Sequence, residues 1–168
     1  QDWYEGSGTA VSFSNNANTL AIGAPNRSPY RDDDAGTVRI YTFQPPLPTY
    51  TVSPSTSFIN EGSKLITTVD TENVDKNTRL YWTLSGSGIN SADFSSGGIN
   101  GSGLVNNEGD MIFSHILAND QKTEGKETLK IKVYSDWART KQVGSTAKVT
   151  INDTSLNPSP AYSLTTSA

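Results

Sequence analysis

The stretch Thr128-Leu129-Lys130-Ile131-Lys132-Val133-Tyr134 alternates apolar and polar residues along its length. Successive side chains of a β-strand point to opposite faces, so this pattern predicts a half-buried strand. Leu129, Ile131 and Val133 would face the core, and the two lysines would face water. The stretch Arg79-Leu80-Tyr81-Trp82-Thr83-Leu84 repeats the pattern, with positions 80, 82 and 84 on the inner face. Two such strands favour a sheet-based core over a helical one.

Similar runs predict further strands over residues 50–53, 64–69, 111–117 and 145–151. Gly-rich connections at 85–88 and 97–103 separate strands, since glycine supplies turns with positive φ. Six or seven short strands in about 105 residues are typical of an immunoglobulin-like Greek-key sandwich. We therefore expect an all-β fold with this sandwich over residues 49–155.

Two unlike regions flank the predicted sandwich. Upstream, residues 1–43 carry three strand candidates, at 9–14, 19–24 and 37–43, and the Asn-rich segment 15–18 suits a tight hairpin. The Pro-rich segment 44–48 predicts a semi-rigid linker, because proline cannot donate to a sheet. Downstream, Pro160-Ala161-Tyr162 echoes Pro48-Thr49-Tyr50. We interpret residues 156–168 as a linker and the start of a further repeat.

The composition excludes several classes of partner. The net charge is −4, with no Lys/Arg-rich run, so nucleic acid is not an expected partner. No apolar stretch approaches the roughly 20 residues of a membrane-spanning helix, so we expect no membrane insertion. The absence of cysteine excludes disulfides and thiolate metal sites. Gln1 is expected to be a processed or trimmed end, because no leader pattern follows it.

Residues for catalysis are scarce in this sequence. The single histidine, His115, alternates onto the same face as Met111, Phe113 and Leu117, which predicts a packed strand histidine and not a general base. Gly98, Gly101 and Gly103 have no strand-to-helix transition around them, so we interpret them as turn glycines and not as a phosphate loop. We expect the chain not to be an enzyme.

The N-terminal region resembles one blade of an FG-GAP-type β-propeller. The resemblance rests on residues 11–14, 20–25 and 36–41 and covers about residues 1–43. Such blades usually carry an Asp-rich calcium loop in the hairpin where this chain has Asn15 to Thr19, with no acid. The acidic run 32–34 is expected to be a solvated loop tip, with a hard-cation site as the alternative.

The sandwich region resembles Calx-β modules. The motifs are Asn60-Glu61-Gly62, Ala92-Asp93-Phe94, an Asp followed by Glu124-Gly125-Lys126-Glu127, and Asn152-Asp153. The resemblance implies that carboxylates converge at one end of the sandwich and bind calcium, and by motif match these are Glu61, Asp93, Asp120, Glu124 and Asp153. Asn152 stands where the family has an acid, which implies weak binding. The alternative is that the acids cap turns by accepting backbone N–H bonds.

Taken together, residues 48–155 are more specifically similar to repeats of large cyanophage virion structural proteins and cyanobacterial surface proteins. This resemblance implies a structural and attachment module of an extracellular filament on a virion or cell surface. Calcium would stiffen this module. The open edges of the three strands predicted in residues 1–43, and the strand-like tail from Ala161, predict separately that at least one end pairs by β-strand addition with neighbouring copies or other parts of the same polypeptide.

Two alternative functions remain open from the sequence. Trp137 lies in a predicted hairpin connection beside Arg139 and Lys141, where an exposed Trp suits contact with a sugar or a neighbouring protein. A carbohydrate-binding module that docks on surface polysaccharide is therefore one alternative, although Trp137 packed over its own hairpin is the simpler interpretation. An accessory domain of a secreted hydrolase is the other, with the enzyme outside these residues.

Overall fold

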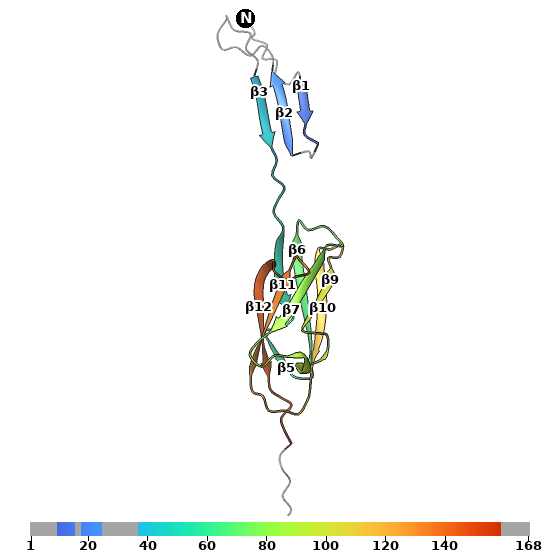
Figure 1. The fold of residues 1–168 in the computed structure, drawn as a ribbon, viewed down its shortest axis with the longest axis vertical. Helices are drawn as coiled ribbons and strands as arrows, with labels where there is room; N and C mark the ends of the chain where they lie inside the picture. The colour runs from blue at the N-terminus through green and yellow to red at the C-terminus, as the bar shows by residue number, and fades with distance from the viewer. Residues whose placement is uncertain (1–9, 16–17, 25–36, 159–168) are drawn as a thin grey trace, which may run out of the picture. The chain divides into compact units, whose positions relative to one another are not determined.

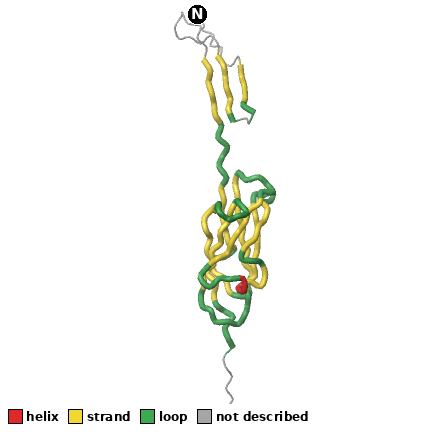
Figure 2. The backbone as a smooth tube through the Cα atoms, viewed as in Figure 1, coloured by secondary structure: helices red, strands yellow, loops and turns green. Residues whose placement is uncertain are grey.

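The computed structural model describes residues 10–15, 18–24 and 37–158. The chain divides into two compact units, residues 1–47 and 48–168. The described parts of both units consist of strands and loops, with a single helical turn (Figures 1 and 2). The all-β prediction is therefore confirmed. The acidic run 32–34 and the predicted strand after residue 160 lie outside the described residues.

The first unit contains a three-stranded antiparallel sheet in the order β1-β2-β3 (Figure 1). Its strands are β1 (Ala10–Phe13), β2 (Thr19–Ala24) and β3 (Thr37–Thr42). The register pairs Phe13 with Leu20, and Leu20 with Tyr41, so apolar side chains line up across the sheet. None of the described residues of this unit is buried, and Val11, Phe13, Val38 and Ile40 are 58–68% exposed.

The second unit is a sandwich of two sheets (Figure 1). One sheet has the order β4-β6-β10-β8, and the other has the order β5-β12-β11-β7-β9. The bounds are β4 (Thr49–Pro54), β5 (Phe58–Asn60), β6 (Lys64–Glu72), β7 (Arg79–Ser85), β8 (Phe94–Ser96), β9 (Asn100–Leu104), β10 (Asp110–Leu117), β11 (Glu127–Tyr134) and β12 (Gln142–Asn152). The helical turn η1 (Ser91–Asp93) precedes β8.

The connections of the sandwich cross between its two sheets. Strands β6 and β7 are consecutive but lie in different sheets, as do β10 and β11; in space β6 pairs with β10 and β7 pairs with β11. This interlocking matches the Greek-key connectivity of immunoglobulin-like sandwiches. The first two strands of the sandwich also lie in different sheets, because β4 pairs with β6 whereas β5 pairs in parallel with β12.

The core of the sandwich is built from the inner faces of both sheets. The predicted inward residues Leu129, Ile131 and Val133 are fully buried, and Leu80 and Leu84 join them. The Trp82 ring stacks on Phe113 of the facing sheet, with ring centroids 4.2 Å apart and an interplanar angle of 4°. Packing of about 15 large apolar side chains in this way supplies most of the stability of such a domain.

The predicted Gly-rich connection at 97–103 is partly wrong. Gly97 does have a positive φ of 83°, as a turn glycine should, but residues 100–104 form strand β9. A Cβ on Gly101 would lie 2.2 Å from Cζ2 of Trp82, and one on Gly103 would lie 2.9 Å from Met111. These two glycines therefore make room for core side chains and do not mark turns. The short strands β5 and β8 were also absent from the prediction.

Candidate functional site

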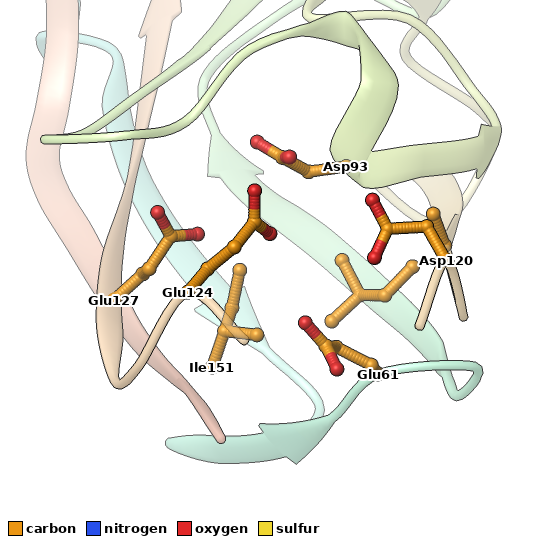
Figure 3. Close-up of a pocket in the computed structure, with 8 residues that line it drawn as sticks. Glu61, Asp93, Asp120, Glu124, Glu127 and Ile151 are labelled. Carbon is orange, nitrogen blue, oxygen red and sulfur yellow. The ribbon is translucent and has the colours of Figure 1, made fainter. Parts of the chain in front are cut away.

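One end of the sandwich, here called the acidic pole, gathers carboxylates from four separate parts of the chain (Figure 3). It lies where β5 and β12 end and β11 begins, and the loop between β10 and β11 crosses it. A small hollow there is lined by most of them, together with Leu117, Ala118 and Ile151. The acids at the pole are Glu61, Asp93, Asp120, Glu124, Glu127 and Asp153.

Two of these carboxylates fasten the loops of the pole to one another. One oxygen of Asp153 accepts hydrogen bonds from the backbone N–H groups of Glu124 and Gly125, at 2.9 and 2.7 Å. One oxygen of Glu61 accepts hydrogen bonds from those of Thr154 and Ser155, at 3.1 and 2.8 Å. The bonded residues lie more than 25 positions apart in sequence. These charge-assisted bonds therefore join separate loops of the pole as well as capping turns.

The other acids are held within their own loops. Asp93 accepts a 2.7 Å bond from the backbone N–H of Asn90, whose side chain accepts one from Ala92, so the two form a capping box around η1. Asp120 accepts a 3.1 Å bond from the backbone N–H of Lys122 and forms a 2.6 Å ion pair with the Lys122 amine. Lys122 thereby places the positive charge of its side chain at the acidic pole.

The electrostatic potential of the pole is negative. The pKa of Glu124 is raised by partial desolvation and by the charges of Asp120 and Asp93. The pKa of Glu127 is raised by desolvation first, and then by Asp93 and Glu124. The pKa of the Lys122 amine is raised by its bond to Asp120, and the pKa of Asp120 is lowered by the same bond. The negative charges of the pole thus favour a bound cation, and they make it unfavourable for all of its carboxyl groups to be ionised at once.

The acids that line the hollow supply oxygen donors of the kind that hard cations prefer, but they are not arranged to hold one. The hollow has a volume of about 10 Å³, enough for one water-sized particle. Oδ1 of Asp153, a pole residue that does not line the hollow, is buried and makes no hydrogen bond. However, no three Asp, Glu or His side chains of the described residues stand in an arrangement that could hold a metal ion as they are. Binding would require side chains to rotate and the Lys122 amine to leave.

Four of the five acids expected to converge line the hollow, and the fifth, Asp153, does not line it but accepts hydrogen bonds from the backbone of Glu124 and Gly125. Glu127 was missed as a pole residue. It is the first residue of β11, and its pairing opposite Ile151 places it beside the hollow. The sequence signal was its place in Glu124-Gly125-Lys126-Glu127, where the second Glu begins an alternating strand.

Trp137 lies at the opposite end of the sandwich, in the connection between β11 and β12, and is 76% exposed. This exposure agrees with its place in a hairpin connection, and the simpler interpretation, in which Trp137 packs over its own hairpin, is wrong. The connection is tightly bonded: the Asp136 carboxylate accepts hydrogen bonds from the backbone N–H groups of Thr140 and Lys141 and from the Thr140 hydroxyl, all within 3.2 Å. These bonds lower the pKa of Asp136.

The Arg139 side chain links this connection to neighbouring strands. Its guanidinium donates to the backbone carbonyls of Trp82, Trp137 and Gly101, at 3.3–3.4 Å. It also lies over the Tyr81 ring, with Cζ 5.7 Å from the ring centroid. Arg139 therefore positions the loop, and most of its donors are already used within the chain.

His115 is packed in the core, as its strand position predicted, and is 1% exposed. Its Nε2 lies 2.9 Å from the Gly98 carbonyl oxygen, which requires Nε2 to carry the proton and donate. Burial lowers its pKa, an effect that the Gly98 bond only partly offsets. The rings of Phe94 and Phe113 contact it edge-on.

No protein-family model matches this sequence, and no curated protein matches it. Among solved structures, domains 4 and 5 of the S-layer protein SbsC match it with a TM-score of 0.33 and 15% sequence identity. The match covers 80% of this chain and 57% of that structure, so the chain spans less than two thirds of its length. Similarity this slight defines neither a shared fold nor a shared function. Within the described residues, no helix has the length and hydropathy needed to cross a membrane.

Proposed function

We propose that this chain is a non-enzymatic structural and attachment module of an extracellular filament, on a virion or cell surface, and that it assembles by β-strand pairing. The observation that carries the proposal is the exposure of apolar side chains on the N-terminal sheet. Its described strands expose large apolar side chains and bury none, whereas the sandwich beside it in sequence is complete. A structural role for the sandwich is also supported by its acids, which fasten loops to one another.

Among the described residues, nothing forms a second layer over the three-stranded sheet. A small sheet is stable only when a second layer or more strands cover its apolar face. Strands β1 and β3 are its edges, and an edge strand has a row of unpaired backbone groups that can recruit another strand. Neighbouring copies, or other parts of the same polypeptide, would supply these strands.

Light scattering on the full chain, coupled to size-exclusion chromatography, tests the proposal. We expect association that rises with concentration, and we expect Val11→Lys combined with Ile40→Lys to abolish it, because a charge on each edge blocks strand addition. Leu47→Lys combined with Leu156→Lys is the matched control, since both are exposed apolar residues outside the strands. A stable monomer in which hydrogen exchange of the β1 and β3 amides is slow would contradict the proposal.

We further propose that calcium stiffens the acidic pole, displacing the Lys122 amine from Asp120. The affinity would be in the millimolar class of extracellular modules, with a Kd of roughly 10⁻⁴–10⁻³ M. Isothermal titration should show binding that weakens in Glu124→Gln and strengthens in Lys122→Met, which removes the competing cation. Glu108→Gln, an exposed acid outside the pole, is the control. The absence of both heat and a shift in Tm at saturating calcium would remove this part of the proposal.

A carbohydrate-binding module is the second candidate function, favoured by the 76% exposure of Trp137 on a tightly bonded loop. An exposed aromatic ring held in place loses little entropy when a sugar ring stacks on it. Retention on immobilised polysaccharides should disappear in Trp137→Ala and persist in Trp137→Phe. Equal retention of all three proteins, or none by the wild type, would argue against this function.

A further inference from the structure

The outer face of the five-stranded sheet is basic. Its outward residues include Arg79 on β7, Lys130 and Lys132 on β11, and Lys148 on β12, together with the half-buried rings of Tyr81 and Tyr134. The five strands contain one acid, Glu127, which lines the hollow at the acidic pole. We call this surface the basic face.

The positive charge of the basic face is not compensated within the described part of the chain. Lys130 and Lys148 are direct partners across the β11–β12 ladder, and like charges placed opposite each other destabilise a sheet. Among the described residues, the ion pair is the one between Lys122 and Asp120, and neither residue lies on the basic face. Lys130 also borders a hollow that Glu124 and Glu127 line, but neither carboxylate pairs with it.

The outer face of the four-stranded sheet is acidic at the end far from the acidic pole, where Asp70 and Glu72 lie, and has one exposed lysine, Lys64, at the pole end. Asp70 on β6 and Asp110 on β10 are also direct partners, so this face contains an acidic pair that matches the lysine pair. Ile66, Ile112 and Ile116 are 39%, 58% and 37% exposed on the same face. We call this surface the acidic face.

We propose that the basic face of one copy docks on the acidic face of a second copy. The isoleucines would pack against Tyr81, Tyr134 and the alkyl stems of the lysines, with the acidic pair opposite Lys130 and Lys148. This inference rests on the proposed assembly role, and adds a lateral contact between sandwiches to strand pairing in the N-terminal unit.

The order of residues along each face defines the relative direction of the two copies. From the acidic pole outwards, the basic face has Lys130 and Lys148 before Tyr81 and Tyr134. The acidic face begins with Ile116, opposite Lys64, and ends with Asp110 opposite Asp70. Only an antiparallel arrangement therefore brings acids to lysines and isoleucines to tyrosines. Because the two faces differ, the contact is heterologous, and it builds a closed ring or an open array according to the rotation between successive copies.

Charge reversal on each face tests the contact. Sedimentation velocity of the full chain should show association that weakens at least tenfold between 50 mM and 500 mM NaCl, because exposed charges are screened. We expect Lys130→Glu with Lys148→Glu to abolish it, and Asp70→Lys with Asp110→Lys to do the same. An equimolar mixture of the two variants should associate again, since each supplies an intact face that complements one on the other. Lys76→Glu with Lys141→Glu makes the same change in net charge in two exposed loops outside both faces and should have no effect.

Repeating these measurements in the Val11→Lys, Ile40→Lys background separates the contact from strand pairing. Salt-sensitive association that survives in that background supports the face contact, even if strand addition itself fails. Association that is insensitive to salt, or that the mixture does not restore, would overturn the proposal. So would a monomer that binds alginate through Lys130 and Lys148, which would assign the basic face to an acidic polysaccharide.

Discussion

The two units of this chain use strands of similar length in opposite ways. In residues 48–158 the apolar side chains of two sheets meet and leave Leu65, Leu80 and Leu129 fully buried. In the three-stranded sheet the same kind of alternation leaves apolar side chains exposed on both faces, because the described residues provide no second layer. Alternation thus defines which residues share a face, but a core forms only where a second sheet covers that face.

Truncation of a buried leucine should give the largest difference between the units. Leu129→Ala should lower the free energy of unfolding of the sandwich by about 2–5 kcal/mol, because it leaves a cavity in a closed core. Val38→Ala in the sheet should cost about 0.5 kcal/mol or less, since Val38 is 66% exposed. Urea titration followed by circular dichroism measures both. Equal costs would show that the sheet is covered in solution.

A second pair of substitutions compares strand glycines. Gly101→Ala should destabilise the sandwich by about 1–3 kcal/mol, because the new methyl group would overlap the Trp82 ring. Gly23→Ala on β2 should be within about 0.5 kcal/mol of neutral, since its Cβ would meet Ala10 at an ordinary 3.5 Å. Thermal unfolding of both variants is the measurement, and a neutral Gly101→Ala would contradict the packing role of β9.

Acid should destabilise the sandwich through His115. Burial lowers its folded-state pKa below 6.5, so the unfolded chain takes up the proton first as pH falls. Stability is therefore lost below pH 6.5, by at most about 1.4 kcal/mol per pH unit for one proton. His115→Gln should remove this slope in urea titrations between pH 7.5 and 5. The pKa values of Glu124 and Glu127 are raised in the folded state, so their protonation stabilises the fold as the pH falls. Both glutamates are present in the wild type and in the variant, so the difference between the two proteins reports His115 alone.

The smallest effect is expected at Trp137. Its side chain is 76% exposed, so Trp137→Ala should change the free energy of unfolding by no more than about 0.5 kcal/mol. Thr140→Ala removes the hydroxyl that bonds to Asp136 in the same loop and should cost more, about 1 kcal/mol. If the order of these two values in urea titrations were reversed, Trp137 would be a packing residue and not a contact residue.

The sequence predicted the parts of the fold that repeat a simple pattern. Long alternating runs such as 79–84 and 128–134 have one apolar face each, so their strands and inward residues were correct. β5 and β8 have three residues each, too few to show a period. β9 was missed because Gly101 and Gly103 have no side chain to alternate, and their function becomes visible only against the Trp82 and Met111 side chains of other strands.

The acidic pole was predictable in its members but not in its bonding. The motifs indicated which acids converge, yet they could not show that Asp153 caps residues 124 and 125, about 28 positions earlier. Nor could they show that Lys122 lies against Asp120, because a loop lysine has no periodic pattern. The sequence interpretations of calcium ligands and of turn caps describe the same side chains; the structure contains the capping bonds of Glu61, Asp93 and Asp153, and calcium binding stays a proposal.

The parallel pairing of β5 with β12 has a mechanical consequence. The ladder pairs Phe58 with Thr150 and Asn60 with Asn152, close to where the chain leaves the sandwich, whereas the chain enters at the opposite end, at Thr49 of β4. If residues 48 and 158 are pulled apart, two parallel strands slide against each other, so tension loads all of their hydrogen bonds at once and does not open them one by one. A side-chain bond from Asn152 to Asn60, 3.0 Å long, shares that load. Force spectroscopy should therefore show rupture in a single high-force step, and Asn60→Ala should lower that force.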